Sequence, residues 1–133
     1  MKLRFFIGAL TCALATSATA QNSPERPVRI LVPFSPGGVV DIAARLVSEQ
    51  LSTKWDKSVL VESKPGGNGF IANIAAARAE PDGYTLLMAH TGEFSVNPAV
   101  FSAVPYDLDR DFVPISLVSG TPLVLAKKDR FTA

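Results

Sequence analysis

The stretch of sequence that decides the fold is Val28-Arg-Ile-Leu-Val-Pro-Phe-Ser-Pro-Gly-Gly-Val-Val-Asp-Ile-Ala-Ala-Arg-Leu46. Its first five residues form a short, largely β-branched run closed by Pro33, which predicts a buried strand of a mostly parallel sheet. Gly37 and Gly38 follow and allow the backbone to turn sharply, because no Cβ stands in the way. The stretch therefore predicts a strand, a tight loop and a helix.

The helix of this stretch has apolar residues at the spacing of one buried face. They stand at 39, 42, 43, 46 and 47, and Arg45, Ser48 and Glu49 are expected on the opposite face. The first amides of such a helix have no acceptor within it, and its N-terminus carries a partial positive charge. The loop before it is thus a candidate seat for an anion, and an ordinary strand-to-helix turn is the alternative.

Two further strand-and-loop units follow the first. Residues 58–62 are a second apolar run, residues 63–69 a second glycine-rich loop, and the pattern from Phe70 predicts a helix that ends at Pro81-Asp82-Gly83. Residues 85–89 predict a third strand, followed by a loop at 90–93. This alternation predicts an α/β fold with a mostly parallel sheet and flanking helices. All three loops should emerge at one edge of that sheet, where ligands bind in open α/β folds.

The remainder of the chain carries weaker signals. Asn97-Pro98 predicts a short helical turn, and residues 105–112 form a charged connector without clear periodicity. Two apolar runs follow at 116–119 and 123–126. Asp107, Asp109 and Asp111 alternate in the connector, but no glycine-containing calcium loop follows, so we interpret them as solvated.

The first 20 residues predict a secretory signal peptide with cleavage after Ala20. Lys2 and Arg4 form a basic start, an apolar core follows, and Ala18-Thr-Ala20 ends it with small residues. The apolar core is shorter than the roughly 20 residues that a membrane helix needs, so a membrane anchor is the less favoured reading. We therefore expect a periplasmic protein whose mature chain is not stably inserted in the membrane.

Composition narrows the possible functions of the mature chain. The sequence has 133 residues, 47% of them hydrophobic, which suits one modest domain. The single cysteine, Cys12, would leave with the signal peptide, so no thiolate nucleophile or cysteine-based metal site is expected. Without Lys2 and Arg4, 11 basic side chains face 12 acidic ones, which argues against nucleic-acid binding.

Two features of the sequence raise enzymatic alternatives to ligand binding. Gly67, Gly69 and Ala72 match the G-x-G-x-x-A fingerprint of dinucleotide-binding enzymes, but the third strand ends Met88-Ala89-His90 with no acid in place to hold a ribose. His90 is the sole histidine, and the sequence shows no obvious serine or cysteine nucleophile for it to activate. We therefore expect His90 to line a cleft. Asp41 is expected to steady nearby amides in the first helical turn. The dinucleotide-binding enzyme remains the alternative.

The order of the motifs resembles the Bug-type solute receptors of tripartite tricarboxylate transporters. The resemblance runs from about Arg26 to the end of the chain. The motifs are Arg26-Pro-Val-Arg-Ile-Leu-Val-Pro-Phe-Ser-Pro-Gly-Gly-Val-Val-Asp-Ile-Ala-Ala-Arg45, Val61-Glu-Ser-Lys-Pro-Gly-Gly-Asn-Gly69, Pro81-Asp-Gly-Tyr-Thr-Leu-Leu-Met88, Asn97-Pro98 and Pro105-Tyr-Asp107. Together they imply one lobe of a two-lobed periplasmic binding protein with no enzymatic activity, catalytic residue, metal or cofactor. They also imply delivery of a small mono-, di- or tricarboxylate to membrane subunits of a transporter.

The resemblance also implies which residues hold the ligand carboxylate. They belong to the three loops, where backbone amides and ordered waters serve as donors. Carried over by position, they are Phe34, Ser35, Gly37, Gly38, Val39, Asp41, Gly66, Gly67, Asn68, Gly69, Phe70, His90, Thr91 and Gly92.

The chain departs from this family pattern in three respects. Val39-Val40 stand where relatives often have a hydroxyl residue, and Asp56 stands at a turn position where glycine is common. Such receptors are usually more than twice this length. Residues 21–133 are therefore expected to be an incomplete first lobe without the second lobe, marginally stable and without measurable ligand affinity by itself.

Overall fold

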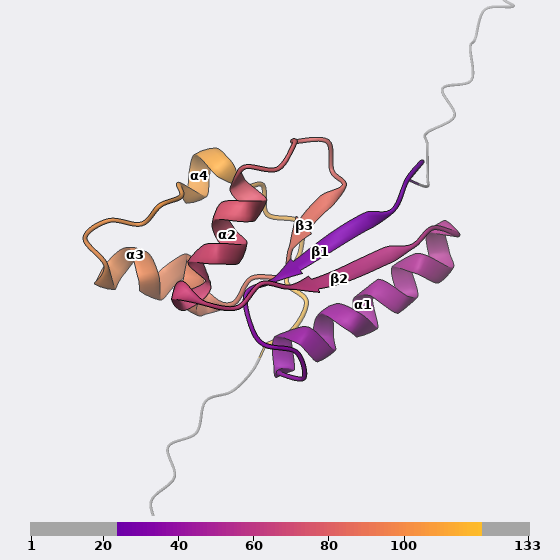
Figure 1. Cartoon of the computed structure of the whole chain (residues 1–133), viewed down its shortest axis with the longest axis horizontal. Coiled ribbons are helices and arrows are strands. Elements are labelled where there is room, and N and C mark those ends of the chain that lie inside the picture. The colour runs from indigo at the N-terminus through magenta and orange to yellow at the C-terminus, as the bar shows by residue number, and fades with distance from the viewer. Residues whose placement is uncertain (1–23, 121–133) are drawn as a thin grey trace, which may run out of the picture.

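The computed structural model describes residues 24–120. The expected signal peptide and the apolar run at 123–126 lie outside the described residues. Three parallel strands form the sheet: β1 (Val28–Val32), β2 (Val59–Ser63) and β3 (Thr85–Leu87), in the order β2-β1-β3 (Figure 1). Val28 pairs with Val59, and Arg29 pairs with Thr85 on the other side. The predicted parallel α/β sheet is confirmed, although β3 is two residues shorter than expected.

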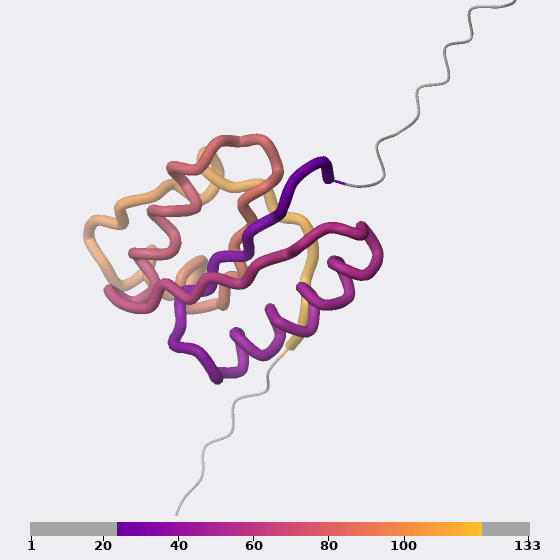
Figure 2. Tube along the Cα trace, turned by 45° about the vertical axis from the view of Figure 1, so that its right-hand side comes forward, coloured from indigo at the N-terminus to yellow at the C-terminus, as the bar shows by residue number. Residues whose placement is uncertain are grey.

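Two helices cover the sheet from opposite sides (Figures 1 and 2). Helix α1 (Val39–Trp55) packs on β1 and β2, and α2 (Phe70–Ala77) packs on β1 and β3. The central strand β1 is therefore enclosed on both faces, and all its residues except Arg29 are buried. Its side chains form the core with Ala44 and Val59. Residues packed around this core are Phe34, Val40, Val47, Leu51, Trp55, Val61, Tyr84, Leu86 and Met88.

The buried face of α1 differs from the predicted one. Val39, Ile42 and Leu46 are 65%, 52% and 60% exposed, whereas Asp41 and Ser48 are buried. The apolar spacing predicted the wrong face because two polar side chains lie on the side of α1 that packs on the sheet. Each of them has hydrogen-bond partners that offset the cost of its burial. Ser48 donates its hydroxyl to the Val59 carbonyl at 2.6 Å, and Asp41 has several donors that are described below.

Helix α2 also buries a polar side chain. Ile71 is 53% exposed, while Ala72 and Asn73 are fully buried. Within the described residues, no hydrogen-bond partner reaches the Asn73 amide. We find no physical compensation for the burial of this amide.

The part of the chain after β3 packs on α2 through an aromatic cluster. It contains the π-helical turn η2 (Gly92–Val96), α3 (Asn97–Val100) and α4 (Leu108–Asp111). Helix α4 lies inside the segment expected to be an irregular connector; its N-terminus is capped by the Asp107 side chain, which accepts from the Asp109 and Arg110 amides. The rings of the cluster belong to Phe70, Phe94, Phe101, Tyr106 and Phe112. No helix within residues 24–120 is both long and apolar enough to cross a membrane.

Candidate functional site

The loops that follow the three strands meet at one edge of the sheet and enclose an open hollow of about 390 Å³. Their convergence confirms the arrangement expected for parallel strands. The first loop contributes aromatic and hydroxyl side chains, the second mostly backbone, and the third an imidazole, a carboxylate and a carboxamide. The lining residues are Pro33, Phe34, Ser35, Pro65, Gly66, Asn68, Gly69, His90, Gly92, Glu93 and Asn97.

The first and third loops touch through two rings. Phe34 follows β1, and its ring meets the His90 ring edge to face with centroids 6.0 Å apart. His90 Nδ1 accepts from the Gly92 amide at 3.2 Å, so this nitrogen is the unprotonated one in this arrangement. The ring contact therefore joins the loops that follow β1 and β3.

The second loop keeps its backbone close to the hollow because most of its residues lack side chains. Gly66 and Gly69 have φ of +119° and +85°, and the intervening turn η1 (Gly67–Gly69) places Asn68 at φ +52°. These left-handed conformations explain why glycine recurs here. Asn97, at the start of α3, donates its side-chain amide to the Asn68 carbonyl at 2.8 Å and so ties the second loop to the third.

The third loop is organised around Glu93, which is 3% exposed. The His90 amide donates to Glu93 Oε2 at 3.0 Å, and the Tyr106 hydroxyl donates to the Glu93 carbonyl. The carboxylate therefore folds the loop back on itself, while Tyr106 anchors its backbone from the aromatic cluster. Glu93 also packs against the second loop, since a β-carbon built on Gly69 would stand 2.6 Å from Glu93 Cγ.

Asp41 lies beside the hollow but does not line it, and hydrogen bonds from three residues hold its side chain. Its carboxylate accepts from Arg45, from the Gly37 amide at 2.9 Å and from the Ser63 hydroxyl at 3.2 Å. The hydrogen bond from Arg45, followed by that from the Gly37 amide, lowers the pKa of Asp41 from 3.8 to about 2. The expectation that Asp41 steadies nearby amides agrees with this geometry.

The structure brings together half of the residues expected to hold a ligand. Those that line the hollow are Phe34, Ser35, Gly66, Asn68, Gly69, His90 and Gly92. Those that belong to the same loops but do not line it are Gly37, Gly38, Val39, Asp41, Gly67, Phe70 and Thr91. Sequence reasoning missed Pro33, Pro65, Glu93 and Asn97. Glu93 and Asn97 could have been found together, because a spacing of four residues places two side chains on one side of a helical turn.

Comparison with known proteins identifies the family. The model of the tripartite tricarboxylate transporter family receptor matches residues 43–132. The chain belongs to this receptor family. A UPF0065 protein of Bordetella bronchiseptica is 44% identical over 110 residues, which cover 83% of this chain and 33% of that relative.

Solved structures agree with this receptor family. The periplasmic binding protein BugD is 40% identical with a TM-score of 0.59, over 63% of this chain and 28% of BugD. MatC of Rhodopseudomonas palustris with bound malate is 35% identical with a TM-score of 0.68, over 71% of this chain and 32% of MatC. Another R. palustris protein, solved with adipate, is 34% identical with a TM-score of 0.61, over 63% of this chain and 28% of that protein. The chain thus spans about a third of the length of the relatives it matches.

Family membership favours a receptor over the dinucleotide-binding alternative. Gly67 and Gly69 do lie between β2 and α2, and Ala72 lies in the first turn of α2, where that fingerprint would place them. The same segment falls inside the region that matches the receptor model, and the structures it resembles are described as periplasmic binding proteins or transporters. Gly67 and Gly69 are therefore explained by the backbone conformation of the second loop, which borders the hollow.

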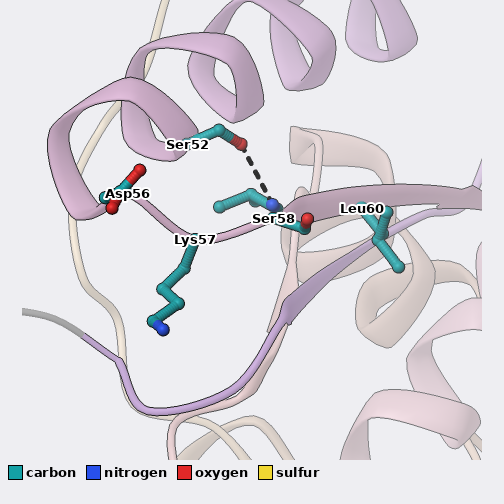
Figure 3. Close-up of a pocket in the computed structure, with 6 residues that line it drawn as sticks. Ser52, Asp56, Lys57, Ser58 and Leu60 are labelled. Atoms are coloured by element: carbon teal, nitrogen blue, oxygen red, sulfur yellow. Dashed lines mark hydrogen bonds between the residues drawn. The ribbon is translucent and has the colours of Figure 1, made fainter.

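A second hollow, of about 410 Å³, lies at the opposite end of β2 (Figure 3). It is lined by the C-terminal end of α1 and the start of β2, including Ser52, Asp56, Lys57 and Ser58. Ser52 accepts from the Val59 amide at 3.0 Å, which ties the helix to the strand. This hollow shares no lining residue with the three-loop hollow among the described residues.

Proposed function

We propose that the three-loop hollow binds the carboxylate of a small mono-, di- or tricarboxylate as part of an extracytoplasmic receptor that delivers it to a tripartite tricarboxylate-type transporter. The observation that carries the proposal is the convergence of three loops rich in backbone donors at the carboxyl edge of a parallel sheet. Structural neighbours of this chain bound to malate and adipate support the ligand class.

The chemistry of the lining suits reversible capture and release. It offers backbone amides, the Ser35 hydroxyl and the Asn68 carboxamide, and none of its lining residues within 24–120 is a Lys or Arg. Hydrogen bonds from neutral donors hold an anion with a smaller net free energy than a buried ion pair would. A receptor that must hand its ligand on benefits from such moderate binding.

The binding test compares two substitutions of one kind on the two hollows. Ser35→Asp places a negative charge in the three-loop hollow, and Ser58→Asp places the same charge in the second hollow (Figure 3). We expect isothermal titration calorimetry with malate, adipate and citrate to show binding that Ser35→Asp weakens at least about tenfold, because like charges repel. Ser58→Asp should leave affinity unchanged, and equal effects of the two variants would contradict the proposal.

The protein used in this test matters because the chain spans a third of its relatives' length. The complete gene product and residues 21–133 should be measured side by side. We expect binding by the complete product, whereas a ligand on one lobe faces water and gains little from its hydrogen bonds. Micromolar binding by residues 21–133 alone would overturn the expectation that this lobe needs a partner.

Export and delivery are tested separately from binding. Mass spectrometry of the periplasmic protein should give Gln21 as the N-terminal residue, because the basic start, apolar core and Ala18-Thr-Ala20 predict cleavage there. A cytoplasmic species that retains Met1 would contradict the periplasmic assignment. Delivery predicts that cells lacking the receptor lose uptake of the same carboxylate that the purified protein binds.

A further inference from the structure

Glu93 places a negative charge inside a hollow proposed to bind anions. It is 3% exposed, and no described ion pair includes it. Among the described residues that line the hollow there is no Lys or Arg, and His90 is the only other titratable side chain. A carboxylate buried without a cation is costly unless a donor satisfies it.

The two oxygens of Glu93 differ in their surroundings. Oε2 accepts from the His90 amide at 3.0 Å. No donor to Oε1 is found within residues 24–120, and this atom lies beside Gly69, where a built β-carbon would stand 2.9 Å from it. The only enclosed side-chain polar atoms without a partner in these residues belong to Asn73. Glu93 Oε1 is therefore reached by solvent and remains free to accept a hydrogen bond.

This arrangement bears on which carboxylates fit. A second carboxylate of a ligand, if placed beside Glu93, would meet a like charge at low dielectric and with no neighbouring cation. A ligand ammonium in the same place would donate to Oε1 and pair with the buried charge. The ligand carboxylate itself would then bind to the amides of the first and second loops, away from Glu93.

We propose that Glu93 makes this receptor select carboxylic acids that also carry an ammonium group, as amino acids do, over plain dicarboxylates of the same length. The inference rests on the proposed function and deepens it, because it names the chemical class of ligand. Glu93 acts here as a specificity-determining residue. The hydrogen bond from the His90 amide positions the Glu93 carboxylate, and Oε1 accepts a hydrogen bond from the ligand ammonium.

The test uses ligand pairs that differ only in the ammonium group. Calorimetry on the complete gene product compares L-glutamate with glutarate, and L-aspartate with succinate. We expect the amino acid of at least one pair to bind at least about tenfold more tightly than its partner. Equal or tighter binding of the plain dicarboxylate in both pairs would overturn the inference while leaving carboxylate binding intact. If malate, adipate and both pairs all fail to bind, the proposed function itself fails.

Glu93→Gln separates recognition of charge from support of the loop. Its amide oxygen can still accept from the His90 amide, so thermal unfolding should match that of the wild-type protein within a few degrees, while the charge is gone. We expect the preference for the amino acid to fall to within about threefold, mainly through weaker amino-acid binding. A uniform loss of affinity for both members of each pair would mean that Glu93 only positions the loop, and would contradict its role in specificity.

Discussion

Two buried carboxylates lie near the same edge of the sheet, Asp41 in the first turn of α1 and Glu93 in η2, and their surroundings are opposite. Asp41 accepts from the Arg45 guanidinium, the Gly37 amide and the Ser63 hydroxyl, so both of its oxygens have donors. Glu93 accepts from one amide through Oε2, and within the described residues no donor reaches Oε1. Their exposures are nearly equal, at 2% and 3%.

The difference shows that burial alone does not say what an acidic residue does. Asp41 joins β2, the first loop and α1, and the adjacent guanidinium offsets its charge, so it behaves as part of the scaffold. Within residues 24–120, Glu93 has no ion pair and one carboxylate oxygen without a donor on the wall of a hollow, which suits recognition of a ligand. Three substitutions test this contrast, and a fourth tests a position far from both carboxylates; their expected effects decrease in that order.

Gly69→Ala should cause the largest loss of stability. The new β-carbon would stand 2.6 Å from Glu93 Cγ and would also occupy a left-handed backbone conformation, with φ +85°. We expect the free energy of unfolding to fall by about 2–4 kcal/mol, measured by urea denaturation. Gly37→Ala is the matched control, since it has the same φ and no atom within 4 Å of its β-carbon. Equal losses in the two variants would mean that Glu93 does not pack tightly against the second loop.

Asp41→Asn should rank second and should also change the response to acid. The folded-state pKa of about 2 lies below the ordinary 3.8, so the stabilisation is present above about pH 4 and is lost as the pH falls toward 2. We expect circular dichroism to show a shallower fall of the unfolding temperature over that range in the variant. Some acid sensitivity should remain, because the Tyr84 amide and Arg26 lower the pKa of Asp82.

The control for Asp41→Asn is Asp56→Asn, which removes the same charge from an exposed position. Asp56 has no hydrogen bond in the described structure that the change would break, and asparagine tolerates its left-handed conformation well. If both variants show the same acid response, the network around Asp41 does not stabilise the fold.

Tyr106→Phe should cost about 1 kcal/mol of unfolding free energy, because it removes a buried hydroxyl that donates to the Glu93 carbonyl. Tyr84→Phe serves as its control, since the Tyr84 hydroxyl accepts an exposed bond from the Glu25 amide and should cost less. In the complete gene product, Tyr106→Phe should also weaken ligand binding, because the third loop loses its anchor. Unchanged stability and unchanged binding would show that η2 is held by the aromatic cluster alone.

Asp56→Gly should have the smallest effect, and it should be stabilising. Asp56 ends α1 at φ +52°, a conformation that glycine adopts without steric cost. We expect a gain of about 0.5–1 kcal/mol in unfolding free energy, far from both carboxylates. Lys57→Gly, one residue on and without a positive φ, should reduce stability. A loss of stability in Asp56→Gly would mean that the Asp56 side chain makes a contribution that the structure does not reveal.

The sequence predicted the backbone framework more accurately than it predicted which side chains face inward. The bounds of β1 were predicted correctly because a β-branched run closed by proline is a local signal. The face of α1 was wrong because periodicity counts apolar residues only, whereas Asp41 and Ser48 are buried with partners on other elements. The helical turn α4 was missed because its signal lies in the Asp107 cap and not in periodicity.

The candidate site divides in the same way between local and distant information. The sequence alone determined the alternation of strands, glycine-rich loops and helices, and hence the shared edge at which three loops meet, since parallel strands point the same way. Only the tertiary structure decided which residues of those loops line the hollow and how each carboxylate is satisfied. Those outcomes depend on contacts between distant positions, such as Ser63 with Asp41 and Asn97 with Asn68, 22 and 29 residues apart. Local patterns carry no record of such pairings, because their free energy arises only when the elements have packed.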